Sequence, residues 1–138
     1  QLLHDECFAF DDGLVTVPQH RVVAGLLELR GHDAKRQVPA DGIGAEVIDL
    51  RTLVPIDTDA ILDSLGKTGR LVVVDYAHRT CGAAAEIAAI VAEDGFASLR
   101  RPIQRVTTPD VNIPFAPALE KPLYPSPARI AAAARRIL

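Results

Sequence analysis

The chain has 138 residues and a formal net charge of −3, the size of one globular domain that buries its core without a metal or a disulfide. Its charges are mixed in sign, and the arginines at 100, 101 and 105 and at 135 and 136 form only two small groups, so we expect no nucleic-acid partner, which would need a clustered basic face. No apolar run approaches the roughly 20 residues of a membrane span and no charged-then-apolar leader begins the chain, so we expect a cytoplasmic protein without membrane contacts.

Cysteine and methionine usage adds two expectations. Cys7 and Cys81 lie far apart and show no Cys-x-x-Cys or Cys/His ligand spacing, so we expect no structural metal. The sequence has no methionine and begins with Gln1, which suggests a processed product, an excised domain or an incomplete reading frame.

Residues 1–44 are the least periodic part of the chain. The best element predicted there is a short strand near Val22–Leu27, which Gly25 inside it and Gly31 after it weaken. The segment 32–42 is polar, and its proline would break any helix drawn through it.

From residue 45 onwards, strands and helices alternate. Glu46–Leu50 is predicted to be a strand, and Asp57 is the N-cap of a helix that Gly66 and Gly69 end. The run Leu71–Asp75 is apolar without interruption until its aspartate, which is typical of a parallel strand buried on both faces. This strand, helix and strand predict a right-handed crossover with parallel pairing.

The second half of the chain continues the alternation. After a loop at 76–81, an alanine-rich stretch predicts a helix with an apolar stripe at Ile87, Ile90 and Val91, and Ile103–Val106 predicts a third strand. A last helix is expected to begin with Ser126 as N-cap and a proline at its first position. This pattern across 45–138 predicts a layered α/β domain.

Residues 108–127 carry six prolines, so they cannot hold a long helix or a long ladder. Apolar side chains stand among these prolines, which is typical of a stiff arm that loses little entropy on ordering. Such an arm lies either across its own domain or against a neighbouring subunit, and the sequence leaves both open.

A candidate catalytic pair follows the buried strand. His78 and Cys81 lie where open α/β sheets place ligands and catalytic groups, at the carboxyl end of a parallel strand. They suggest a Cys/His nucleophile activated by a helix N-terminus, but no third orienting group is visible, so a packing role is the preferred interpretation. The loop 80–82 also offers backbone N–H groups to an anion. Real phosphate loops are absent, and 66–68 matches only the end of one, at the wrong end of its helix.

Three charged residues near strand ends have weaker signals. Asp49 and Arg51 are two residues apart and therefore point to one side of a strand, where they could pair; alternatively, Arg51 lies in the following loop and binds a backbone carbonyl. A structural role is preferred for both. Asp75 ends its strand with no partner visible in the sequence.

Three stretches together carry a family resemblance: EVIDLRTLVPID at 46–57, TGRLVVVDYAHRTCGAAAEIAAIVAEDGF at 68–96 and PIQRVTTPDVNIPFAPALEKPLYPS at 102–126. In order and without gaps, from about Gly42 to Leu138, the chain resembles the C-terminal domain of the β-subunit of thiamine-diphosphate-dependent 2-oxo acid dehydrogenases. These enzymes are the decarboxylating first components of the pyruvate, branched-chain 2-oxo acid and acetoin dehydrogenase complexes, in the wider transketolase family.

The resemblance implies a three-layer α/β/α sandwich with a mixed, mostly parallel sheet that builds subunit contacts. The implied partners are the α-subunit and a second β-subunit of an α2β2 heterotetramer, and the acyltransferase core that carries lipoyl groups. In that family, thiamine diphosphate and Mg²⁺ sit between the α-subunit and the N-terminal pyrimidine domain of the β-subunit, whose glutamate activates the cofactor. This chain lacks that domain, so we expect it to bind no cofactor or metal and to hold no catalytic residue.

Residues 1–41 depart from the resemblance, since relatives have a first strand and a long amphipathic helix where this chain has VVAGLLELRGHDAKRQVPADGI. We therefore divide the chain into a poorly matched segment at 1–41, irregular or frameshifted, and a transketolase C-terminal-like domain at 42–138. A frameshift, a partial reading frame and real divergence would each produce this boundary.

These observations favour an assembly domain of an oxidoreductase β-subunit, not catalytic alone. Two alternatives remain open: a free-standing α/β interaction module that has lost the enzyme, and a small Cys/His hydrolase. The sequence does not identify which 2-oxo acid the parent enzyme would use.

Overall fold

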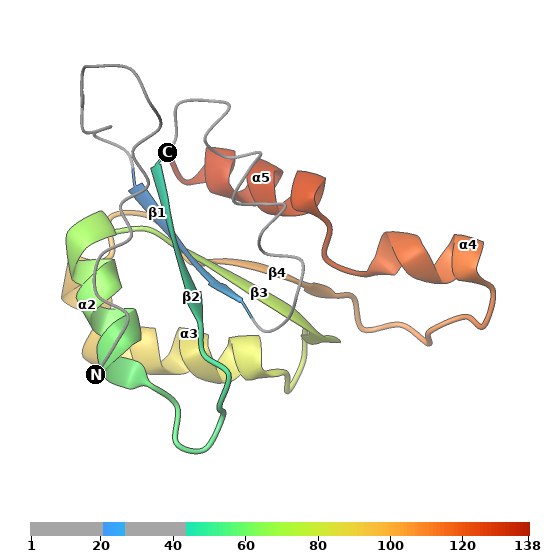
Figure 1. Ribbon diagram of the computed structural model, residues 1–138, viewed down its shortest axis with the longest axis horizontal. Helices are drawn as coiled ribbons and strands as arrows, with labels where there is room; N and C mark the ends of the chain where they lie inside the picture. Colours follow the sequence, from blue (N-terminus) through green and yellow to red (C-terminus); the bar gives the residue numbers. More distant parts are fainter. Residues whose placement is uncertain (1–20, 27–43) are drawn as a thin grey trace.

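A computed structural model describes residues 21–26 and 44–138, whose strands form one sheet (Figure 1). The strands are β1 (Arg21–Leu26), β2 (Gly44–Asp49), β3 (Leu71–His78) and β4 (Gln104–Thr108), in the order β2-β1-β3-β4. All three pairings are parallel. The mostly parallel sheet is confirmed, and the described strands include no antiparallel member of the kind that a mixed sheet implies.

Helices cover both faces of this sheet, as the three-layer prediction requires. They are α2 (Thr58–Thr68), α3 (Ala83–Asp94), α4 (Pro117–Glu120) and α5 (Pro127–Arg136), with 3₁₀ turns at Phe96–Ser98 and Lys121–Leu123. In Figure 1, α2 and α3 lie on one side of the strands and α5 lies on the other. The predicted α/β/α sandwich is therefore present.

Strand β3 separates the two halves of the core, because its side chains alternate between the faces. Val72 and Val74 pack with the buried residues of α5, whereas Leu71 and Val73 pack with those of α2 and α3. All four side chains are buried. The uninterrupted apolar run in the sequence follows directly from this double coverage.

Local signals place the helix ends as predicted. The carboxylate of Asp57 accepts a hydrogen bond from the Ala60 N–H at 3.0 Å, and the Ser126 hydroxyl accepts one from the Arg129 N–H at 3.3 Å. Gly69 ends α2 in the left-handed conformation, and its N–H donates to the Leu65 carbonyl. Each contact spans three or four residues, so the sequence alone was sufficient to predict it.

Some details differ from the predictions. β3 runs three residues past Asp75, because its end pairs again with β4 at His78 and Thr108 after an irregularity. Gly66 lies inside α2 rather than at its end. In α3, Ile90 is only half-buried and Ala84 is fully buried, since a small side chain lets the helix lie close to the sheet.

The strand predicted near Val22–Leu27 is confirmed as β1, an inner strand between β2 and β3. The sheet therefore includes residues from both sides of the boundary predicted at residue 42. The rest of 1–41 lies outside the described residues, so that boundary and the irregular or frameshifted character of the segment stay predictions. Within the described ranges, no helix has the length and apolar character that crossing a membrane would need.

Two glycines near the end of α2 predict opposite responses to alanine. Gly66 is exposed in the helix, and an added methyl group meets no atom within 4 Å, so Gly66→Ala should stabilise the fold by about 0.5–1 kcal/mol. Gly69 has a φ of 69°, and a methyl group there would lie 2.7 Å from Arg100 Cγ. Gly69→Ala should destabilise by roughly 1 kcal/mol or more. Urea unfolding measures both free energies, and changes of the same sign would contradict the assignment of these positions.

Candidate functional site

The carboxyl ends of β3 and β4 lie side by side, because the two strands pair in parallel. This edge of the sheet brings together the loop at 79–82, which leads into α3, and the chain that leaves β4 at residue 109. Open α/β sheets commonly bind ligands at such an edge. His78, Cys81 and Asp75 all belong to this region, so it is the candidate site that the sequence predicted.

Asp75 has two partners that the sequence did not reveal. Its side chain is buried, with the residue 3 % exposed, and its two oxygens accept hydrogen bonds from the Ala77 N–H at 2.8 Å and the Ala84 N–H at 2.9 Å. Ala84 lies in the first turn of α3, whose N-cap residue, Gly82, has no side chain that could cap the helix. Asp75 therefore caps α3 from the neighbouring strand, where a negative charge also suits the helix dipole.

Gly82 makes room for this cap. A Cβ atom at Gly82 would lie 2.5 Å from the His78 carbonyl oxygen and 3.0 Å from the Asp75 carboxylate. Backbone and carboxylate can approach each other this closely only at glycine. Since the Ala84 N–H already bonds to a carboxylate of its own chain, it is not available to the external anion that the loop at 80–82 suggested.

The structure does not pair His78 with Cys81. The Nε2 atom of His78 lies 3.2 Å from the Val111 carbonyl oxygen, to which it donates a hydrogen bond, and the ring is exposed. Cys81 is an exposed free thiol with a φ of 58°. In the described part of the chain, no hydrogen bond joins these two side chains. This geometry gives no support to the interpretation of the two residues as nucleophile and base.

The chain that leaves β4 is fastened to the loop after β3. The carboxylate of Asp110 accepts hydrogen bonds from the Thr80 N–H at 3.0 Å and from the Thr80 hydroxyl at 2.7 Å. These two bonds, with smaller contributions from His78 and Arg79, hold the pKa of the Asp110 carboxyl below its ordinary value. We call this contact the first anchor.

A second anchor holds the proline-rich segment at its far end. The guanidinium group of Arg129 donates to the carbonyl oxygens of Leu123 at 2.9 Å, Tyr124 at 2.8 Å and Thr107 at 2.9 Å. The Tyr124 hydroxyl donates to the Glu120 carboxylate at 2.7 Å, which raises the pKa of Tyr124. The ring of Tyr124 also lies 5.5 Å from that of Tyr76 on β3, between centroids.

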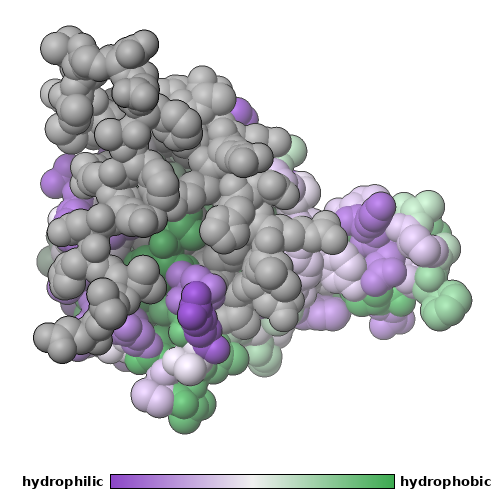
Figure 2. Space-filling model, in the orientation of Figure 1, coloured by the Kyte–Doolittle hydropathy of each residue, from purple (hydrophilic) through white to green (hydrophobic). Residues whose placement is uncertain are grey.

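Between these anchors, residues 109–124 form an arm that extends away from the sheet (Figure 1). Four of its large apolar side chains are exposed: Val111 at 47 %, Ile113 at 38 %, Leu119 at 62 % and Phe115 completely. Figure 2 shows apolar surface on this projection. The sequence left open whether the arm packs on its own domain. Among the described residues, the ends of the arm pack on the domain and its tip does not.

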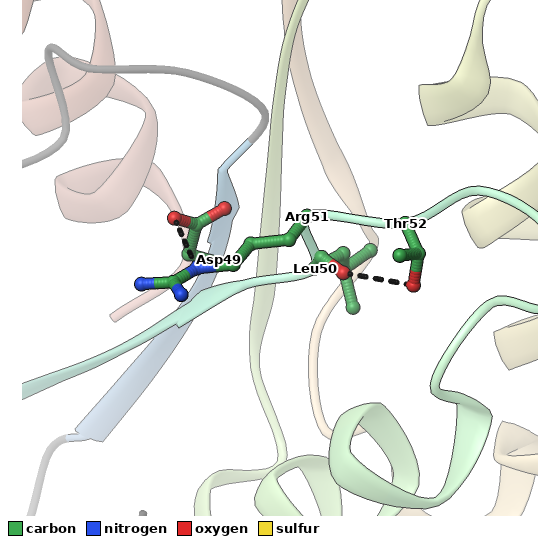
Figure 3. Close-up of polar contacts among 4 residues, drawn as sticks. All are labelled: Asp49, Leu50, Arg51 and Thr52. Carbon is green, nitrogen blue, oxygen red and sulfur yellow. Dashed lines mark hydrogen bonds and ion pairs between the residues drawn. The ribbon is translucent and has the colours of Figure 1, made fainter.

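Asp49 and Arg51 pair at the end of β2 (Figure 3). Arg51 Nε lies 3.5 Å from Asp49 Oδ2, and both side chains are largely exposed. Arg51 lies in the loop beyond the strand, with a φ of 52°, where its neighbour Thr52 donates to the Leu50 carbonyl. The predicted pairing is confirmed, but an exposed ion pair of this kind contributes little to stability. It supports the structural interpretation.

Two buried or bridging arginines were missed by sequence reasoning. The guanidinium group of Arg70, which is buried, donates from Nε to the Ile137 carbonyl oxygen at 2.8 Å, at the end of α5. Arg129 joins the arm to β4, as described above. The sequence signal for both is only an arginine beside an apolar element, which is too common to be informative.

No three His, Cys, Asp or Glu side chains gather into a potential metal site among the residues that the structure describes. The polar groups at the strand ends bond mainly to one another. The region therefore resembles two loops held together by hydrogen bonds more than a binding cleft.

The comparisons with known proteins agree on one family. The family model described as "Transketolase, C-terminal domain" matches residues 31–130. Its match thus begins before the boundary predicted at residue 42.

Several relatives are β-subunits of 2-oxo acid dehydrogenases or of an acetoin oxidoreductase. The β-subunit of acetoin:2,6-dichlorophenolindophenol oxidoreductase from Cupriavidus necator is 45 % identical over 117 residues, which cover 85 % of this chain and 35 % of that protein. The β-subunit of 2-oxoisovalerate dehydrogenase from Pseudomonas aeruginosa is 45 % identical over 104 residues, covering 74 % and 29 %. The β-subunit of the pyruvate dehydrogenase E1 component from Rickettsia felis is 43 % identical over 105 residues, covering 76 % and 32 %. The chain spans about a third of the length of these relatives.

A solved structure shares the fold. It is described as a split-gene transketolase, an inactive β4 tetramer, and it matches with a TM-score of 0.70 and 24 % identity over 88 % of this chain and 39 % of its own.

Removal of the Asp75 carboxylate should be costly. Asp75→Ala leaves the buried Ala84 N–H without a partner, so we expect a loss of about 2–3 kcal/mol in the free energy of unfolding. Asp57→Ala is the matched control, because it removes an exposed N-cap and should cost about 1 kcal/mol. Chemical denaturation measures both losses. An Asp75→Ala variant no less stable than Asp57→Ala would contradict the role assigned to Asp75.

The first anchor should respond to acid. Because the pKa of Asp110 is lower in the folded than in the unfolded chain, the contribution of the anchor is complete above about pH 4 and is lost as the pH falls through the lowered pKa. Thr80→Val removes the hydroxyl but keeps the N–H, so it should raise the pKa part of the way towards 3.8. Carboxyl ¹³C NMR titration measures this pKa, and an unchanged value in the variant would refute the anchor.

Proposed function

Because the chain belongs to the transketolase C-terminal domain family, we propose that it is the assembly domain at the C-terminal end of a 2-oxo acid dehydrogenase β-subunit, without catalysis of its own. Its relatives are β-subunits of such enzymes, and they match it over most of its length. On this proposal, the chain contributes contacts between subunits, and the chemistry belongs to domains that the longer relatives contain.

The observation that supports an assembly role is the distribution of polar and apolar groups. At the carboxyl ends of β3 and β4, where an enzyme of this architecture would hold its ligand, Asp75, Thr80 and Asp110 bond within the chain. Large apolar side chains are instead exposed on the arm, as is typical of a surface that a partner covers. This arrangement suits contact with another protein better than contact with a small substrate.

The described residues do not fit thiamine diphosphate. A diphosphate with Mg²⁺ needs oxygen ligands that converge on the metal and free N–H donors for the phosphates. The described residues gather no such set of metal ligands, and the carboxylate of Asp75 would repel a phosphate at the start of α3. We therefore derive no step of the reaction from this chain.

The parent enzyme and its partners are part of the proposal. The parent enzyme would decarboxylate a 2-oxo acid on thiamine diphosphate with Mg²⁺ and pass the acyl group to lipoamide. Its other chains would be an α-subunit, a second β-subunit and the lipoyl-bearing acyltransferase core, all in the cytoplasm. The assembly of the split-gene transketolase as a β4 tetramer lends support to self-association among chains of this fold.

The two alternatives make different demands on the structure. A free-standing interaction module would use the same exposed arm but would not bind an α-subunit, so a binding experiment separates it from the first proposal. A Cys/His hydrolase would need a base beside Cys81, whereas the imidazole of His78 is engaged with Val111. We do not propose the hydrolase further.

Reconstitution with a cognate α-subunit tests the proposal. In the presence of thiamine diphosphate and Mg²⁺, the chain with the α-subunit should give no 2-oxo acid turnover, whereas the α-subunit with a full-length β-subunit should be active. Excess chain should lower that activity by competing for subunit contacts. Turnover by the chain with the α-subunit would contradict the proposal that this chain has no catalytic role of its own. If excess chain did not lower the activity, the free-standing interaction module would be favoured.

A further inference from the structure

We propose that Arg129 and the far end of the arm seal the edge of the sheet at β4, so that this strand does not accept a strand from another chain. The seal goes beyond the assembly role proposed above and does not depend on it. The tip of the arm, residues 111–119, takes no part in it. Three observations support the seal: the direction of one backbone carbonyl, the three bonds of one guanidinium group, and the burial of an end strand.

β4 is an edge that needs protection. It lies at one end of the strand order β2-β1-β3-β4, and among the described strands it pairs only with β3. An end strand presents backbone N–H and C=O groups on its outer side, and an extended segment of another chain can pair with them. The sequence of β4 suits such pairing, because Val106, Thr107 and Thr108 are β-branched.

The carbonyl group of Thr107 points to the outer side of β4. Arg79, directly after β3, donates its N–H to the Thr108 carbonyl oxygen at 2.9 Å, so the Thr108 carbonyl faces β3. Because carbonyl groups alternate in direction along a strand, that of Thr107 faces away from β3. A strand added at this edge would need the Thr107 carbonyl oxygen as an acceptor.

Arg129 on α5 already occupies this acceptor. Its Nη2 atom donates to the Thr107 carbonyl oxygen at 2.9 Å, while Nη1 donates to the carbonyl oxygens of Leu123 at 2.9 Å and Tyr124 at 2.8 Å. A guanidinium group has five N–H donors in a planar fork, so it can hold three carbonyl groups at once. The far end of the arm is thereby fixed at the outer side of β4, where an added strand would lie.

The burial of β4 agrees with this arrangement. Val106, Thr107 and Thr108 are buried although they belong to an end strand, and Val106 packs with the buried side chains of α5. Prolines at 102 and 109 stand on either side of the strand, which has five residues. A short edge strand between prolines offers little backbone to a second strand. Contacts with other chains are then left to side chains, which select their partners, whereas an open edge pairs with many sequences.

Binding of a strand-forming peptide to the purified full chain tests the seal. The probe is a fluorescent peptide with blocked ends and the sequence IQRVTT of residues 103–108, and fluorescence anisotropy measures its dissociation constant. Arg129→Ala should bind the peptide at least about tenfold more tightly than the unchanged chain, because it frees the outer carbonyl and loosens the arm. Hydrogen exchange should then show new protection of the amides of 104–108 in the variant.

Two variants control for charge and for stability. Arg136→Ala removes the same charge from an exposed position on the same helix, and Asp57→Ala weakens the fold at α2, on the other face of the sheet. Both should bind the peptide within about twofold of the unchanged chain. Circular dichroism should show every variant folded under the conditions of the assay.

Equal affinity of the unchanged chain and Arg129→Ala would overturn the seal, whether both bind the peptide or neither does. Binding by Asp57→Ala as tight as that by Arg129→Ala would also overturn it, because a general loss of stability would then expose the strand. If Arg129→Ala does not fold, Arg129→Lys takes its place. Its ammonium group lacks the fork that holds three carbonyl groups, so it should bind the peptide at least about threefold more tightly than the unchanged chain, and equal affinity would again overturn the seal.

Discussion

The buried carboxylate of Asp75 is the contact on which the arrangement of this domain most depends. It joins the end of the central strand to the start of α3 through two backbone N–H groups, and only a glycine at position 82 lets the loop close around it. A carboxylate in this place satisfies an otherwise free donor of the helix and faces the positive end of its dipole. The same contact occupies the Ala84 N–H, which lies where related architectures bind anions, so this donor serves stability and is not free for a ligand.

The opposite end of β3 shows a complementary contact. Arg70, directly before the strand, donates to a carbonyl at the end of α5, where a positive charge suits the helix dipole. One strand thus supplies an anion to a helix on one face of the sheet and a cation to a helix on the other. Together with the alternating side chains of Leu71–Val74, these two contacts fix both helical layers to β3. With both layers fixed, the carboxyl ends of β3 and β4 can hold the arm in place.

The sequence was sufficient where contacts are local and insufficient where they are not. The caps at Asp57 and Ser126 lie three residues from their partners, and the double-faced burial of β3 is visible in its own composition. The helix N–H that Asp75 caps lies nine residues away, and the α5 carbonyl that Arg70 binds lies 67 residues away, so both contacts depend on how the layers pack. For the same reason, the sequence did not show whether the arm packs on its own domain or on a neighbouring subunit. Its prolines predict stiffness, but the direction in which it projects is set by anchors in the loop after β3, on β4 and on α5.

In this domain, the polar groups at the carboxyl ends of β3 and β4 bond within the chain, and an apolar arm projects from it. Such a domain is suited to hold subunits together. Contact with partners should therefore bury the tip of the arm and leave the exposure of the loop after β3 unchanged. Hydrogen exchange followed by mass spectrometry, at low and at high concentration of the chain, tests it most directly. We predict that the amides of 111–119 gain protection on association, whereas those of 76–84 are equally protected in both samples. Protection gained at 76–84, with 111–119 unchanged, would contradict the account.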